Sequence, residues 1–169
     1  RFKTAKPLLD AADAAPGYGP ARLAQGLLAE FSGDLSDAGQ QLDEATRLLG
    51  ADSAEVDYTR AHAQEKEGDA RAAARSLRSA IRDGYDFTLA IRALVDLARR
   101  AGDQVEEGNL LQMLYRSSEA PGVDLLAAMG RVYLIQRREA EAKVLFDRGL
   151  ADDPGNLDCL SGLAYCAYS

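Results

Sequence analysis

The sequence is poor in the residue types that usually build reactive centres. Its 169 residues include no Trp, one His and two Cys. A metal site needs several ligands, and His62 has no Cys or second His near it in sequence. Cys159 and Cys166 are seven residues apart, which on one helix separates them by about 10 Å, beyond the reach of a disulfide. We therefore expect no metal site and no internal disulfide, and we interpret both cysteines as packing residues. Redox or intermolecular pairing is the less favoured alternative.

Sequence signatures of enzymes are also missing. The chain has no glycine-rich phosphate loop and no dinucleotide-binding fingerprint. Its carboxylates are numerous but spread in surface-like pairs such as Glu65 with Glu67 and Asp152 with Asp153. A solvated helix face explains such pairs better than acid–base chemistry does. We therefore expect that the chain is not an enzyme and holds no cofactor.

Long apolar runs and an excess of positive charge are lacking as well. No apolar stretch approaches the length that spans a bilayer, so direct membrane insertion is not expected. The net charge of −7 argues against nucleic acid as a partner, because such proteins carry a basic face. The chain begins at Arg1 without Met and has no signal-like apolar run, so we interpret it as an excised, soluble fragment. Cytoplasm and periplasm both stay open as its compartment.

The sequence instead carries an apolar pattern of helical period, clearest between residues 123 and 156. There are few β-branched residues and no strand-like alternation, while the wealth of Ala, Leu and Arg favours helix. Three- and four-residue steps place one set of apolar or small residues on one face of a first helix and another on a second helix. The two sets are Leu126, Met129, Gly130 and Tyr133, then Ala142, Leu145, Phe146 and Gly149. One such hairpin cannot bury its stripe alone, so copies must stack.

Copies recur at a period of 34 to 35 residues. The marker is a Gly-Asp pair at the turn between the two helices: Gly33-Asp34, Gly68-Asp69 and Gly102-Asp103. Glycine suits a left-handed helix end, and the aspartate can cap the next helix. In the fourth copy Arg137-Arg138 occupies this turn, although the rest of the pattern is best there.

The order and spacing of these residues resemble the tetratricopeptide repeat (TPR). The fourth copy reads L-x2-M-G-x2-Y from Leu126, then A-x3-F from Ala142, then Pro154, with Leu126 where the family often has Trp. The resemblance implies an all-α fold, a right-handed α-solenoid of stacked antiparallel helix pairs, with about eleven helices of roughly 11–16 residues. The chain would be one solenoid and part of a longer array. The bias toward Ala and toward Arg over Lys is compatible with a bacterial source.

The period divides the chain into repeats. We predict the second helix of a preceding repeat at 1–18, full repeats at 19–52, 53–86, 87–121 and 122–155, and the first helix of a further repeat at 156–169. Asp86 and Asn156 are predicted helix caps. The repeat at 53–86 is the weakest, because Asp57, Arg60 and Gln64 stand where apolar residues are expected. Either that helix is rotated or its packing is partly polar.

In TPR arrays the first helix of each pair lines a concave groove, so the resemblance implies a peptide or helix of a protein partner as the ligand. The predicted groove residues are Tyr58, Thr59, His62, Arg92, Asp96, Arg99, Arg131 and Tyr165. Three arginines on an acidic molecule favour an acidic or carboxylate-bearing partner, since guanidinium forks suit carboxylates. The alternative is that these arginines are ordinary solvated residues, some of them paired with Asp96 or Asp124, and that His62 is an ordinary helix histidine. The Lys and Asn clamp of chaperone-binding TPR domains is absent, which disfavours a co-chaperone role.

A second hypothesis belongs to another class of function. The chain would be a structural spacer, or a self-assembling segment of a larger bacterial export, pilus or secretion assembly factor. Its last helix would then expose Leu160, Leu163 and Ala164 and form homo-oligomers through an uncapped end.

Overall fold

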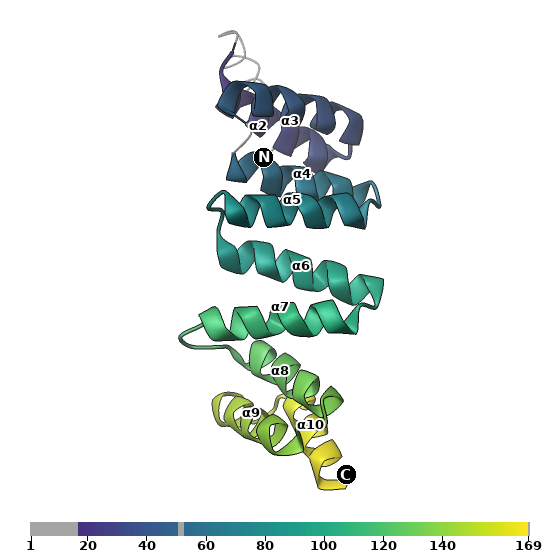
Figure 1. The fold of residues 1–169 in the computed structure, drawn as a ribbon, viewed down its shortest axis with the longest axis vertical. Helices are drawn as coiled ribbons and strands as arrows, with labels where there is room; N and C mark the ends of the chain where they lie inside the picture. Colours follow the sequence, from purple (N-terminus) through teal and green to yellow (C-terminus); the bar gives the residue numbers. More distant parts are fainter. Residues whose placement is uncertain (1–16, 51–52, 169) are drawn as a thin grey trace. The chain divides into compact units, whose positions relative to one another are not determined.

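The computed structural model describes residues 17–50 and 53–168, and within these ranges the chain is helical with no strand. The predicted helix at 1–18 falls almost wholly outside the described residues. The described ranges hold nine helices of 12 to 15 residues, against the roughly eleven expected for the whole chain. They are α2 Gly19–Ser32, α3 Leu35–Leu49, α4 Ala54–Lys66, α5 Ala70–Arg82, α6 Phe87–Ala101, α7 Gln104–Ser117, α8 Val123–Ile135, α9 Glu139–Asp152 and α10 Leu157–Tyr168. The all-α fold of paired helices expected from the sequence is confirmed (Figure 1).

The predicted turn chemistry is confirmed at three turns. Gly33, Gly68 and Gly102 have φ of 87°, 86° and 70°, the left-handed region that glycine enters without a steric penalty. Each following aspartate accepts a hydrogen bond from the backbone N–H three residues on, as Asp69 does from Ala72 at 2.9 Å. Asp86 and Asn156 cap α6 and α10 in the same way, through Leu89 and Cys159.

The fourth turn keeps this backbone shape without a glycine. Arg137, with φ of 60°, is the only non-glycine residue with positive φ in the described part of the chain. Arg138 at the cap position makes no side-chain hydrogen bond to the backbone of α9. The turn therefore keeps the conformation but loses both of the residues that favour it.

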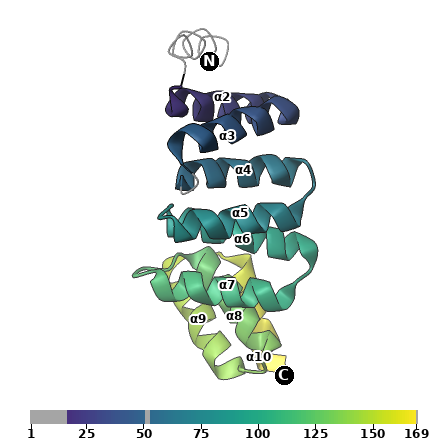
Figure 2. The same ribbon diagram turned by 45° about the horizontal axis from the view of Figure 1, so that its top comes forward.

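The chain divides into two compact units, Arg1–Leu97 and Ala98–Ser169, with the boundary inside α6. In the first unit α2 pairs with α3 and α4 with α5, while α3 and α2 also contact α4 (Figures 1 and 2). Leu42 and Ala45 of α3 meet Val56 and Ala63 of α4 in a buried cluster, with Leu23 of α2 against it. The first helix pair of this unit thus buries part of its apolar stripe against α4 of the next pair.

Helix α4 resolves the ambiguity of the weakest repeat in favour of partly polar packing. Arg60 is half-buried, and its guanidinium donates to Asp43 Oδ1 at 2.7 Å, Thr46 Oγ1 at 2.8 Å and Leu42 O at 3.2 Å, all on α3. Gln64 Oε1 accepts from Ser76 Oγ of α5 at 2.9 Å. Buried polar groups are tolerated when their hydrogen bonds are made, so α4 packs with polar residues at positions where the pattern expects apolar ones.

In the second unit one phenylalanine joins three helices. Phe146 of α9 is fully buried, and its ring fills the space that a Cβ would need at Gly130 of α8 and at Gly162 of α10. Gly130 therefore allows the ring of Phe146 to approach α8 closely. Around the ring lie buried Ala127, Ala142 and Cys159 and partly buried apolar side chains that include Tyr133 and Leu163.

Candidate functional site

In the first unit the predicted groove positions of α4 form an aromatic cluster. The ring of Tyr58 stacks on that of Tyr85, with centroids 4.1 Å apart, and meets His62 edge-on at 4.7 Å. Burial raises the pKa of both tyrosines, with smaller contributions from Asp86 and Glu65 at Tyr58, and from Tyr58, Asp86 and Glu55 at Tyr85, so both are neutral phenols at physiological pH. His62 Nδ1 lies 3.9 Å from Glu65 Oε2. The cluster offers flat apolar faces with polar edges.

Two features of this cluster differ from what the pattern indicates. Thr59 is only 4% exposed, and its hydroxyl donates to Glu55 O at 2.8 Å within α4, so its side chain is not at the surface. Tyr85 was not among the predicted residues, because it lies in the loop before α6 and outside the helical stripe. The one feature of the sequence that could have pointed to Tyr85 is its position next to Asp86, the predicted cap of the following helix.

Helix α6 carries three of the other predicted residues. Arg92 and Asp96 are exposed in the first unit. Arg92 makes no ion pair with the residues that the structure describes, whereas Asp96 has an interaction of its own. Arg99 lies in the second unit, where its Nε donates to Glu107 Oε1 of α7 at 2.9 Å.

The remaining predicted groove residues belong to the second unit. Arg131 of α8 pairs with Asp158 of α10, Nη1 to Oδ2, at 3.0 Å, and both side chains are largely exposed. Tyr165 of α10 is exposed. Two of the three predicted arginines are thus partnered by acids of the chain, although these acids are Glu107 and Asp158 and not the Asp96 or Asp124 of the alternative interpretation.

The three residues predicted for self-association share α10 but not one environment. Leu160 and Ala164 are exposed, whereas Leu163 is half-buried and packs against the Phe146 cluster. Leu157 and Tyr168 add to the exposed side, being 79% and 93% exposed. The exposed apolar side of α10 is therefore centred on Leu157 and Leu160 rather than on Leu163.

The structure offers little reactive chemistry in the part that it describes. No group of three or more His, Cys, Asp or Glu side chains there is arranged to hold a metal ion. Cys159 and Cys166 are free thiols, and burial raises the pKa of the Cys159 thiol. Among the described helices none combines the length and the apolarity needed to cross a bilayer.

Comparisons with known proteins place this arrangement in a known fold. No family model and no curated protein sequence matches the chain. Among solved structures, YrrB, described as a TPR protein with an unusual peptide-binding site, superposes with a TM-score of 0.74 at 17% identity, covering 94% of this chain and 81% of that one. PilF of Pseudomonas aeruginosa superposes with a TM-score of 0.72 at 14% identity, covering 96% of this chain and 74% of that one. MamA superposes with a TM-score of 0.69 at 18% identity, covering 99% of this chain and 92% of that one. Together with the repeated turns and the paired helices, these likenesses show that the chain has the tetratricopeptide-repeat fold.

Proposed function

We propose that the chain is a protein-interaction scaffold whose first helices, α4, α6, α8 and α10, bind a peptide or helix of a partner protein. The observation that carries this proposal is that seven of the eight predicted positions reach the surface: Tyr58, His62, Arg92, Asp96, Arg99, Arg131 and Tyr165. Tyrosine and arginine are enriched at protein interfaces. The similarity in fold to YrrB, described as having a peptide-binding site, supports the same class of function.

In the first unit the proposed contacts are to an acidic segment. Arg92 is exposed and lacks an ion pair among the described residues, so a carboxylate that approaches it displaces no acid of the chain. The Tyr58 and His62 rings can pack against apolar parts of the same ligand. A charge-assisted pair at Arg92 with aromatic packing at α4 would favour a ligand in which acidic and apolar side chains alternate.

In the second unit the two arginines Arg99 and Arg131 can contribute less to the binding of an acidic ligand than Arg92 can. Arg99 and Arg131 already pair with Glu107 and Asp158. A guanidinium has five N–H donors and can share a second carboxylate, but an exposed pair is worth only about 0–1 kcal/mol. We therefore expect Arg92 to dominate recognition of an acidic ligand.

The partner can be captured through α6 itself. A photo-crosslinking residue at the exposed position Thr88 should trap the partner, whereas the same residue at Arg75, exposed on the second helix α5, should not. With the partner identified, Arg92→Ala should weaken binding by on the order of 2 kcal/mol, about thirtyfold, because the bound ligand would partly remove the pair at Arg92 from water. Arg75→Ala is the matched control and should leave the affinity unchanged.

Salt gives an independent measurement of the same contact. Affinity for the captured partner should fall as ionic strength rises, because exposed charge pairs are screened, and the fall should be smaller for Arg92→Ala. Equal affinity and equal salt dependence for the variant and the parent would contradict recognition through this arginine.

A second candidate function, a self-associating spacer, is favoured by α10. Its exposed side presents Leu157, Leu160 and Tyr168, an apolar strip of a kind that marks interaction surfaces. Two proteins with a similar fold are PilF and PilW, the latter described as a type IV pilus biogenesis factor. On this proposal the chain positions other parts of an assembly and pairs with a second copy through α10.

Light scattering tests this second candidate. The chain should form dimers at high concentration, and Leu157→Ser with Leu160→Ser should return it to monomers. Leu89→Ser, at a comparably exposed leucine of α6, should not. A chain that stays monomeric across the accessible concentration range would rule out association through α10.

A further inference from the structure

The aromatic residues of the first unit are bordered by acids. Four residues of α4 follow one another at steps of three and four and therefore share one face of the helix: Glu55, Tyr58, His62 and Glu65. From the loop before α6, the ring of Tyr85 stacks on that of Tyr58, and Asp86 directly follows it. We call these six residues the α4 cluster.

The carboxylates of the α4 cluster lie close enough for their charges to act on the phenols. Burial is the largest cause of the raised pKa of both tyrosines. Charge adds to it, from Asp86 and Glu65 at Tyr58 and, after Tyr58 itself, from Asp86 and Glu55 at Tyr85. No arginine or lysine of the described residues contributes to either shift. The electrostatic potential at the two rings is therefore negative.

The cations that are near the α4 cluster in sequence are engaged elsewhere. Each of three pairs with an acid outside the cluster: Lys66 with Glu30 of α2, Arg60 with Asp43 of α3, and Arg82 with Asp83. Glu55 and Asp86 make no ion pair within the described part of the chain. Asp86 keeps its charge while it caps α6 through the N–H of Leu89. Both carboxylates can therefore pair with a cation from outside.

The rings add a second attraction for a cation. The face of an aromatic ring is negative and attracts a cation within about 6 Å of its centre. Tyr58 and Tyr85 lie nearly parallel, 4.1 Å apart, so each covers only one face of the other. Both tyrosines are half-buried, while Glu55 and Asp86 are exposed, so a ligand can reach the cluster from solvent. A carboxylate would be repelled at the same place.

Among cationic groups, the arginine side chain uses both attractions. Its guanidinium is planar, stacks on aromatic faces and donates two parallel hydrogen bonds to one carboxylate. Its aliphatic stem can pack on the apolar part of the tyrosine rings. The lysine ammonium is a strongly hydrated point charge without a face to stack. A quaternary ammonium binds to ring faces but has no N–H group to donate to a carboxylate.

We propose that the α4 cluster binds an arginine side chain of the partner protein, with the guanidinium against the tyrosine rings and within reach of the carboxylates of Glu55 and Asp86. The role of this contact rests on the proposed function, because α4 is one of the first helices proposed to bind the partner. It adds a basic residue of the ligand at α4 to the acidic residue expected at Arg92.

Blocked pentapeptides test the contact without the natural partner. The central residue is arginine, lysine, trimethyllysine, glutamine or glutamate, with two glycines on either side, so that only this residue carries charge. His62 is the only histidine of the chain, and its ring lies 4.7 Å from that of Tyr58. Its imidazole NMR resonances therefore report binding at the cluster. The arginine peptide should shift them at the lowest concentration, and the glutamine and glutamate peptides should leave them unchanged.

Substitutions within the α4 cluster locate the site. Glu55→Gln with Asp86→Asn removes both charges, and the fold should be retained because Glu55 is exposed and asparagine caps a helix as well as aspartate does. This double variant should weaken binding of the arginine peptide at least threefold, and Tyr85→Leu should do the same. Asp37→Asn removes a charge from the exposed face of α3 and is the control that should leave the affinity unchanged.

Three results would overturn the proposal. They are an arginine peptide that leaves the His62 resonances unchanged, equal affinity in the parent and the double variant, and a trimethyllysine peptide that binds as tightly as the arginine peptide. The proposed function fails separately. If the arginine peptide does not bind but Arg92→Ala still weakens the captured partner, only the arginine contact is wrong. If the arginine peptide binds as expected but no partner is trapped at Thr88, the contact is supported and the scaffold function is not.

Discussion

Replacing Phe146 by Ala should lower the free energy of unfolding by about 3–5 kcal/mol, the range measured when a buried phenylalanine is truncated. The ring is fully buried and packs against α8 and α10 at Gly130 and Gly162. Since neither glycine has a side chain that could move into the space, the void should collapse poorly. A loss of this size is a large part of the roughly 5–15 kcal/mol that stabilises a typical domain.

Urea unfolding followed by circular dichroism measures this loss, and hydrogen exchange locates it. Amide protection should fall in α8, α9 and α10 and hold in α2 to α5, because each repeat contacts only its neighbours. Phe31→Ala is the matched control: that ring on α2 is 64% exposed, and its removal should cost well under about 1 kcal/mol. A cost below about 1 kcal/mol at Phe146 would contradict the packing described here.

The same Gly→Ala substitution should destabilise the protein at Gly162 and stabilise it at Gly39. Alanine is favoured over glycine within a helix by about 1 kcal/mol. At Gly39 of α3 a Cβ would meet nothing within 4 Å, so the protein should gain up to that amount. At Gly162 of α10 the Cβ would overlap the ring of Phe146, which is held on all sides. Overpacking of about 1–3 kcal/mol should outweigh the helical gain there.

Urea unfolding of the two single variants measures whether each substitution stabilises or destabilises the protein. A double variant that combines Gly162→Ala with Phe146→Leu tests whether the overlap with Phe146 causes the loss of stability. Because leucine leaves room beside Gly162, the cost of Gly162→Ala should be smaller in that background than in the parent. Equal costs in both backgrounds would mean that the overlap with Phe146 is not the reason for the destabilisation.

Much of the fold could be predicted from the sequence because its determinants are local. A left-handed glycine followed by a capping aspartate depends only on a few consecutive residues, and all three such turns form as expected. The contact between Gly130 and Phe146 also follows from the pattern within one repeat. Gly162 was not linked to the same ring, because it lies in the next repeat and the pattern of one hairpin carries no information about it.

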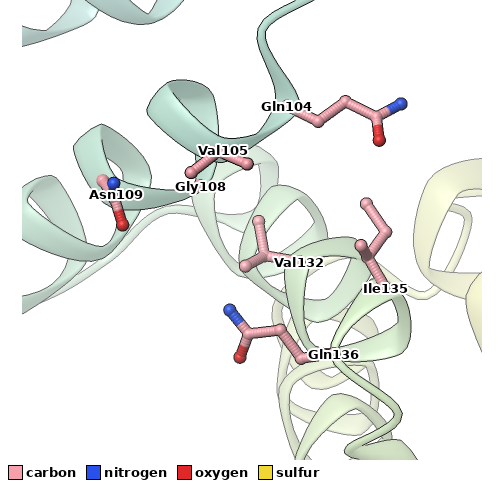
Figure 3. A pocket seen from close by; sticks show the side chains of 7 residues that line it. All are labelled: Gln104, Val105, Gly108, Asn109, Val132, Ile135 and Gln136. Atoms are coloured by element: carbon pink, nitrogen blue, oxygen red, sulfur yellow. The ribbon is translucent and has the colours of Figure 1, made fainter.

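The surface was less predictable because it depends on partners that are distant in sequence. Arg60 looked like a misfit until the carbonyl of Leu42 and the hydroxyl of Thr46 were found beside it. Helical periodicity marked Thr59 as a groove position, yet its hydroxyl bonds within its own helix and its side chain is buried. The unusual turn at Arg137 was visible in the sequence, but the depression next to it, whose lining includes Val105, Val132 and Gln136, arises only when α7 meets α8 (Figure 3).

The contacts within each unit also bear on how the chain folds. Helices touch their immediate neighbours or the next helix but one, as α2 touches α4 and α8 touches α10. Few contacts therefore require the closure of a long loop, and the entropy lost before a contact forms is small. Folding rates rise as the mean sequence separation of contacts falls. Each unit should thus form its helices and pack them in microseconds to milliseconds, the range of proteins rich in local contacts. Folding can begin in either unit.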